Sequence, residues 1–222
     1  MVSPALPRRS FLARVTAGAA AFGAAFAADP ASAWAATASA KPDELDAWFA
    51  SMHGPNKAIF DCTNTPSAAS GVMFARNLMK FSTEKLGTRD ADMSVVVCFR
   101  HFATPFGYND AMWAKYPQMA DMLQADDPAT KKRAMRNWLL HVPVEGQEGA
   151  NLPGLLGHGA SFAICGAATD FVAGQLAGPG GDAKAIAAEL AHNLVPGGRL
   201  VVAGIVAVQR AQKAGFAYTY AG

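Results

Sequence analysis

Charged residues are scarce in this sequence. Only 16% of its 222 residues are Asp, Glu, Lys or Arg, and the formal net charge is +2. A nucleic-acid-binding protein presents a basic surface to phosphates, which so small an excess of positive charge does not provide. A disordered chain combines low hydrophobicity with high net charge, whereas 51% of these residues are apolar. The composition therefore indicates one globular domain and no nucleic-acid partner.

The sequence also lacks a hydrophobic run long enough to remain in a membrane. Its N-terminal apolar run, residues 15–28, has about 14 residues and is rich in Ala and Gly, whereas a spanning helix needs ~20. Arg8 and Arg9 precede this run, and small residues follow it as far as Ala40. This order of basic, apolar and small residues is typical of a cleaved export signal, and we therefore expect no permanent membrane anchor.

The paired arginines, followed by Phe11 and Leu12, resemble the twin-arginine export signal of bacteria. We therefore interpret residues 1–40 as a twin-arginine signal peptide with a short linker, with the twin-arginine (Tat) export machinery as partner. The mature chain is expected to be periplasmic or secreted. Cleavage after Ala33, Ala35 or Ala40 fits the sequence equally well. Cleavage after Ala33 leaves a mature net charge of zero.

Residues 41–222 alternate between strand-like and helix-like patterns. Short apolar runs predict strands over 57–62, 93–99, 161–165, 200–205 and 216–220. Helical spacing of apolar residues predicts helices over 67–85, 109–116, 167–176, 182–194 and 206–214. Such alternation predicts a single α/β domain with a mainly parallel five-stranded sheet and helices on both faces. Residues 118–150 are more polar and are interpreted as a helical insertion, with a helix from Thr130 to Trp138.

Cysteine is limited to three residues, and neither C-x-x-C nor H-x-x-x-H spacing occurs. Cys62, Cys98 and Cys165 each fall at the carboxyl end of a predicted strand, and in a parallel sheet those ends form one edge where ligands bind. A disulfide between two of them, or a metal site that also uses His101, is an alternative. Because metal-ligand spacing is absent, we expect no metal ion at this edge, and we expect no cofactor.

Cys165 has the strongest case for reactivity. It precedes Gly166 and a predicted helix, and the positive potential at a helix N-terminus favours the thiolate, which is the nucleophile. Gly166 would allow a substrate to approach closely. The alternative is a small buried residue, and packing is the favoured interpretation for Cys62 and Cys98.

Further candidate ligand-binding residues lie in the loops around these cysteines. Arg100 and His101 follow the second strand and could hold an anion beside Cys165, in a segment, 100–116, that is dense in polar and aromatic groups. The alternative is that this segment packs against another subunit. The remaining candidates in these loops are Asn64, Asp110, Trp113 and His158. We expect His158 to join the cysteines at the same edge of the sheet.

Two stretches of the C-terminal half, 159–168 and 194–218, carry a family resemblance. In the first stretch, a predicted strand ends at Cys165 and small residues begin the next helix. In the second stretch, Gly197-Gly198 precede an apolar strand, a helix that contains Gln209 follows, and the stretch ends in Gly215-Phe216-Ala217-Tyr218. Both resemble the DsrE/DsrF-like sulfur-relay family. The resemblance implies a small parallel α/β fold, assembly as trimers or hexamers, and a persulfide carried on the cysteine at the position of Cys165.

These observations lead to two functional expectations. The first is an exported DsrE-like protein that binds or transfers a small sulfur-containing or anionic species through a thiolate at Cys165, stabilised by the helix terminus and by Arg100 and His101. The second is a non-catalytic, oligomeric ligand-binding module on the same fold.

Overall fold

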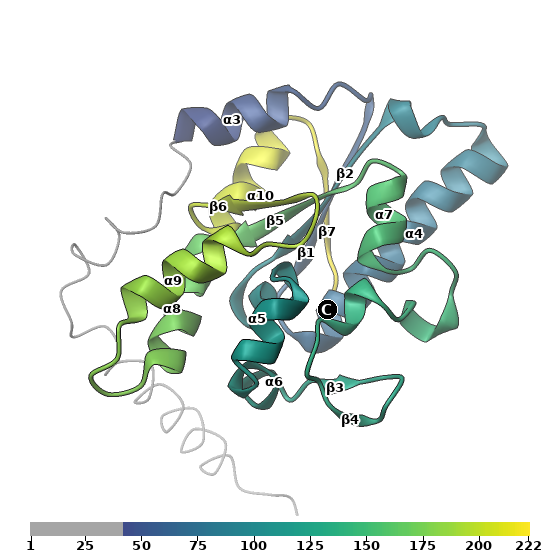
Figure 1. Cartoon of the computed structure of the whole chain (residues 1–222). Coiled ribbons are helices and arrows are strands. Elements are labelled where there is room, and N and C mark those ends of the chain that lie inside the picture. The colour runs from purple at the N-terminus through teal and green to yellow at the C-terminus, as the bar shows by residue number, and fades with distance from the viewer. Residues whose placement is uncertain (1–41) are drawn as a thin grey trace, which may run out of the picture. The chain divides into compact units, whose positions relative to one another are not determined.

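The computed structural model of the protein describes residues 42–222 (Figure 1). The expected export signal lies outside these residues. A five-stranded, entirely parallel sheet forms the centre, in the order β6-β5-β2-β1-β7. Its strands are β1 (Asn56–Cys62), β2 (Met93–Phe99), β5 (Ser161–Cys165), β6 (Gly198–Val201) and β7 (Ala217–Tyr220). The predicted α/β architecture is thus confirmed.

Helices cover both faces of the sheet and make it a three-layer structure. The longer helices are α3 (Pro42–Ala50), α4 (Thr65–Leu86), α8 (Gly166–Ala177), α9 (Ala183–His192) and α10 (Gly204–Lys213). The shorter ones are α5 (Asp110–Lys115), α6 (Gln118–Leu123), α7 (Leu152–Gly157), and 3-10 turns at Asp90–Asp92, His101–Gly107, Trp138–Leu140 and Val144–Gly146. None of the helices in this described part of the chain is long and apolar enough to cross a membrane.

Alternate residues of the strands build two separate cores. Phe60, Val97 and Phe162 face α4, α8 and α9 in the larger core. Ile59 and Val96 face α3 and α10 in the smaller core on the other side of the sheet. Because successive strand residues point to opposite faces, a strand buried on both sides reads as a continuous apolar run. All seven residues of β2, the central strand, are buried, as its sequence predicts.

The chain changes sides of the sheet between β5 and β6. The helices that follow β5, α8 and α9, pack on the face with the larger core, whereas the helix that follows β6, α10, packs on the other face (Figure 1). Connections from the carboxyl ends of two adjacent strands therefore diverge, which defines a topological switch point of an open parallel sheet. Ligands of α/β proteins bind preferentially at such a point.

Two predicted elements differ from the structure. No helix spans residues 130–138: β3 (Asp126–Asp127) and β4 (Lys132–Arg133) form a short hairpin, and a 3-10 turn begins only at Trp138. The side chain of Asp127 accepts a hydrogen bond from the amide of Ala129 (2.8 Å), and this local bond closes a turn in place of a helix.

The strand predicted over 200–205 is also shorter, because β6 ends at Val201 and α10 begins at Gly204. A Cβ atom at Gly204 would lie 2.4 Å from the Cβ of Arg100. This close approach of two backbones requires glycine at the start of the helix.

Candidate functional site

The carboxyl edge of the sheet gathers the three cysteines, as the sequence predicts. β1 ends at Cys62, β5 ends at Cys165, and Cys98 is the penultimate residue of β2. All three thiols are free and buried, so none of them forms the disulfide considered from the sequence. Their surroundings differ in burial and in hydrogen bonding.

Cys165 is the N-cap residue of α8 and lies at the switch point. Its Sγ accepts a hydrogen bond from the backbone amide of Ala168 at 3.3 Å, and the residue keeps a small exposure, 6%. The Thr169 hydroxyl donates to the carbonyl of Cys165 (2.9 Å), and the buried Tyr108 hydroxyl donates to Thr169 (2.8 Å). The predicted position at a helix N-terminus is confirmed, and a backbone amide of the first turn of α8 points at the sulfur.

Gly166 has a different role from the expected one. A Cβ atom at this position would lie 2.8 Å from the carbonyl oxygen of Val201 and 3.0 Å from that of Val202. The missing side chain therefore lets α8 begin directly against β6, and the space beside Gly166 is occupied by backbone, leaving none there for a substrate.

Cys62 and Cys98 are fully enclosed. Burial raises the pKa of both thiols far above the ordinary range, and the nearby Asp61 carboxylate raises them further. The Sγ of Cys98 points to the carbonyl of Gly204 (3.7 Å), whereas Cys62 packs against Gly71 of α4. These two thiols stay protonated at neutral pH and fill the cores on opposite faces of the sheet.

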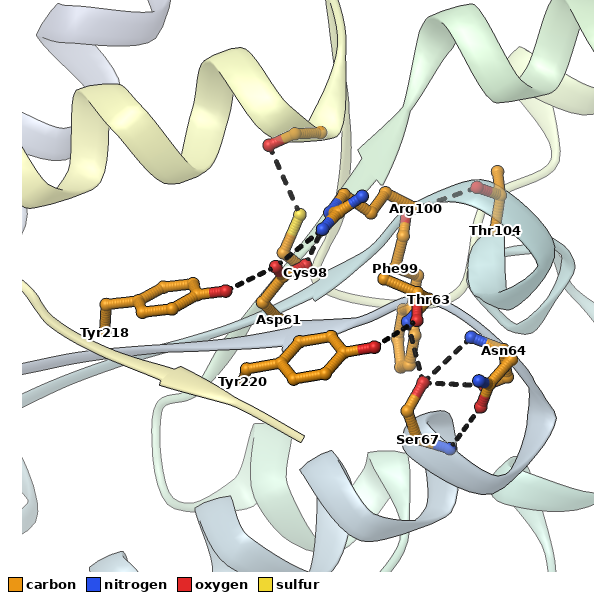
Figure 2. Close-up of polar contacts among 11 residues, drawn as sticks. Asp61, Thr63, Asn64, Ser67, Cys98, Phe99, Arg100, Thr104, Tyr218 and Tyr220 are labelled. Carbon is orange, nitrogen blue, oxygen red and sulfur yellow. Dashed lines mark hydrogen bonds and ion pairs between the residues drawn. The ribbon is translucent and has the colours of Figure 1, made fainter. Parts of the chain in front are cut away.

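A buried ion pair lies at the neighbouring part of this edge. Asp61 in β1 has no solvent exposure and receives two hydrogen bonds from Arg100, from Nε at 2.7 Å and from Nη2 at 2.9 Å. The Tyr218 hydroxyl of β7 donates to the same carboxylate at 2.9 Å. Figure 2 shows Arg100 and Tyr218 pointing at Asp61 from opposite sides, with Cys98 beside them. The bidentate geometry is the strongest form of such a pair.

This network changes the role expected of Arg100. The Asp61 carboxylate raises the pKa of the Arg100 guanidinium, and its charge is balanced inside the protein. In the described chain, no hydrogen bond or ion pair joins Arg100 or His101 to Cys165. Sequence reasoning missed Asp61 and Tyr218, although a carboxylate within the apolar run Ala58–Cys62 was a signal that a buried partner must exist.

His101 has an unusual backbone conformation at this edge. Its φ is 53°, in the left-handed region that favours glycine. Burial and the positive charge of Arg100 lower the pKa of its imidazole, although a hydrogen bond with the backbone of Thr63 opposes the shift. The ring lies edge-on to Phe102 (4.4 Å between centroids), and Phe102 contacts the half-exposed Phe171 of α8 (6.3 Å). Aromatic rings thus connect His101 to the helix that Cys165 caps.

Three other candidates serve the fold. Asn64 caps α4, where its side chain accepts from the amide of Ser67 at 2.8 Å (Figure 2). Asp110 anchors the insertion, accepting from the amide of Asn137 (3.0 Å) and contacting His141 (2.6 Å). Trp113 is buried, and its ring nitrogen donates to the carbonyl of Pro105 (2.9 Å).

His158 does not join the cysteines, and this expectation is wrong. It precedes the start of β5 and contacts Asp90 (2.8 Å), which precedes the start of β2. Since β2 and β5 run parallel, both residues lie at the amino edge of the sheet, opposite Cys165.

No three His, Cys, Asp or Glu side chains are gathered closely enough to hold a metal ion within residues 42–222. The fold and the edge together define a class: a three-layer α/β protein with a cysteine at the switch point of a parallel sheet. No protein-family model matches the chain, and comparison with curated proteins and with solved structures gives no match.

Proposed function

We propose that this protein binds and transfers sulfane sulfur through Cys165, as an exported sulfur carrier of the DsrE-like type. One observation carries the proposal: the Cys165 thiol caps α8 at the switch point and accepts a backbone N–H there. A sulfur atom in this position can bear negative charge without a neighbouring cationic side chain. The contrast with Cys62 and Cys98, which burial keeps protonated, supports Cys165 as the reactive thiol.

The reaction is a sulfane-sulfur exchange with a small-molecule persulfide. The Cys165 thiolate attacks the terminal sulfur of the donor R–S–SH, a new S–S bond forms to Cys165, and the S–S bond of the donor breaks. The proton moves from the transferred sulfur to the departing thiolate, so that Cys–S⁻ and R–S–SH give Cys–S–S⁻ and R–SH. The N-terminal amides of α8 stabilise the persulfide anion as they stabilise the thiolate.

The test is persulfide loading measured by intact-protein mass spectrometry. Incubation with a small persulfide such as cysteine persulfide should add one sulfur atom to the wild-type chain and none to C165S. C98S is the matched control, because it removes a buried thiol from the adjacent strand and should load normally. Loading that persists in C165S overturns the proposal.

Export forms part of the same proposal. The signal features of residues 1–40 support translocation through the twin-arginine route. Replacing Arg8 and Arg9 with Lys should retain the protein in the cytoplasm, and cell fractionation measures this. Unchanged export of the double variant would contradict it.

The alternative, an oligomeric ligand-binding module, has its own supporting observation. Phe74, Leu78 and Phe81 of α4 are about half exposed, as are Tyr218 and Tyr220 of β7. β7 is an edge strand without charged residues, and such edges are usually protected in monomers. We propose that a second copy of the chain covers this edge, with the β7 strands of the two copies side by side in a symmetric dimer.

Light scattering coupled to size exclusion separates the two possibilities. Self-association that F81E weakens, together with no persulfide loading on Cys165, favours the module. A monomer contradicts it.

A further inference from the structure

A separate cavity lies near the amino edge of the sheet, away from Cys165. It has a volume of about 330 Å³, within the range of small-molecule sites. Residues of α4 form one wall, and Gly149, Leu155 and His158 form the other. No residue of the thiol site takes part in it.

The cavity contains a buried arginine without a counter-ion. Arg76 is only 9% exposed, and its Nε donates to the carbonyl of Glu148 (2.9 Å) while Nη1 donates to the Asn77 side chain (3.0 Å). Neither partner is charged, and no carboxylate within residues 42–222 forms an ion pair with Arg76. Buried charges are normally paired, since removing them from water is costly.

The other arginines of the described chain show that Arg76 is exceptional. All of them are more exposed than Arg76, and most pair with carboxylates. These paired residues are Arg89, Arg100, Arg133, Arg136 and Arg210. The arginine that most needs a negative partner is therefore one that has none among residues 42–222.

We propose that this cavity binds the carboxylate or phosphate group of a small molecule, with the Arg76 guanidinium as its principal partner. Guanidinium groups bind both kinds of oxyanion through paired N–H donors. Lys80, one turn further along α4, supplies a second positive charge and is only loosely paired with Glu84 (3.7 Å).

Two carboxylates at the cavity restrict the class of ligand. Glu84 and Glu148 are exposed and also line the cavity, so it presents charges of both signs. A polyanion such as a nucleic acid would be repelled by them, whereas a small molecule with one oxyanionic group can reach Arg76 and avoid them. The volume of the cavity agrees with a ligand of that size.

Calorimetric titration with inorganic phosphate and with acetate, at constant ionic strength, tests the proposal. At least one of the two should bind, and R76Q should weaken that binding about tenfold. Preference for phosphate or for acetate identifies which oxyanion the cavity accepts. R89Q is the matched control, because it alters an exposed arginine that pairs with Asp92, and it should bind as the wild type does.

The outcomes that overturn the proposal are direct. Neither anion binds, or R76Q binds as tightly as the wild type. If R76Q does not fold, K80Q replaces it, because Lys80 is partly exposed, and binding unchanged in K80Q then also overturns the proposal. C165S should retain anion binding, so failure of the proposed thiol function is distinguishable from failure of this one.

Discussion

The two halves of the carboxyl edge hold their acidic side chains in different ways. In the half formed by β1, β2 and β7, the Asp61 carboxylate is enclosed and receives hydrogen bonds from Arg100 and Tyr218. In the half at the switch point, the sulfur of Cys165 is held by the backbone amide of Ala168. The Asp61 carboxylate is fixed by the opposite charge of Arg100, and such a pair stabilises the fold. The Cys165 sulfur has no charged partner among the described residues and is expected to be able to bond to a substrate. Chemistry is therefore expected at Cys165 and structural stability from Asp61.

The largest expected effect comes from breaking the Asp61 network. R100A leaves a buried carboxylate without its cation, and we expect the free energy of unfolding to fall by about 3 kcal/mol. Urea unfolding followed by circular dichroism measures this loss. R89A is the control, because Arg89 and Asp92 form an exposed pair, and it should change stability little.

The double variant D61N/R100M sharpens the test. It removes the carboxylate charge together with its partner, so part of the stability lost in R100A should return. If R100A is as stable as the wild type, the Asp61 network does not stabilise the fold.

The second prediction compares the alkylation rate of Cys165 with those of Cys62 and Cys98. With iodoacetamide at pH 8, Cys165 should be alkylated in the folded protein at least about tenfold faster than Cys62 or Cys98, because burial keeps the latter two protonated. Peptide mass spectrometry over a time course gives the three rates. In concentrated urea the three rates should converge. Faster labelling of Cys62 or Cys98 in the folded state would reverse the assignment.

The enclosed thiols also predict a dependence of stability on alkaline pH. Their pKa values are raised in the folded protein, so the unfolded chain loses these protons first as the pH rises. Stability is full below the unfolded thiol pKa and declines above it, by up to about 1.4 kcal/mol per pH unit for each thiol.

The variant C62A/C98A isolates this contribution. After subtraction of its stability difference at pH 7, its free energy of unfolding should decline less steeply between pH 8 and pH 10.5 than that of the wild type. Urea unfolding at each pH provides the measurement. Equal slopes would show that these thiols ionise alike in both states.

The sequence predicted those features of the fold that depend on residues close together in the chain. The apolar run of β2 specifies a strand buried on both faces, and the cap at Cys165 follows from a strand followed by small helix-forming residues. The link from Asp61 to Tyr218 could not be predicted, because it depends on β7 returning beside β1, a pairing of residues far apart in the sequence. His158 was misplaced although the strand predicted over 161–165 already separates it from Cys165, which puts the two residues at opposite ends of β5.

The smallest effect concerns His101, which lies between the two halves. A residue other than glycine with φ near 53° is strained, so H101G should raise the free energy of unfolding by up to about 1 kcal/mol if the histidine ring contributes little to stability. Lys131 has a similar φ, 57°, in the β3–β4 turn, and K131G is a matched control for the strain alone. Urea unfolding compares the two variants, and persulfide loading of Cys165 is measured in both.

Strain that persists at a functional position is retained for what the side chain does, so H101G should slow loading while K131G should not. Equal loading rates in the two variants would assign His101 to the fold and leave Cys165 with the helix terminus as its only activating group.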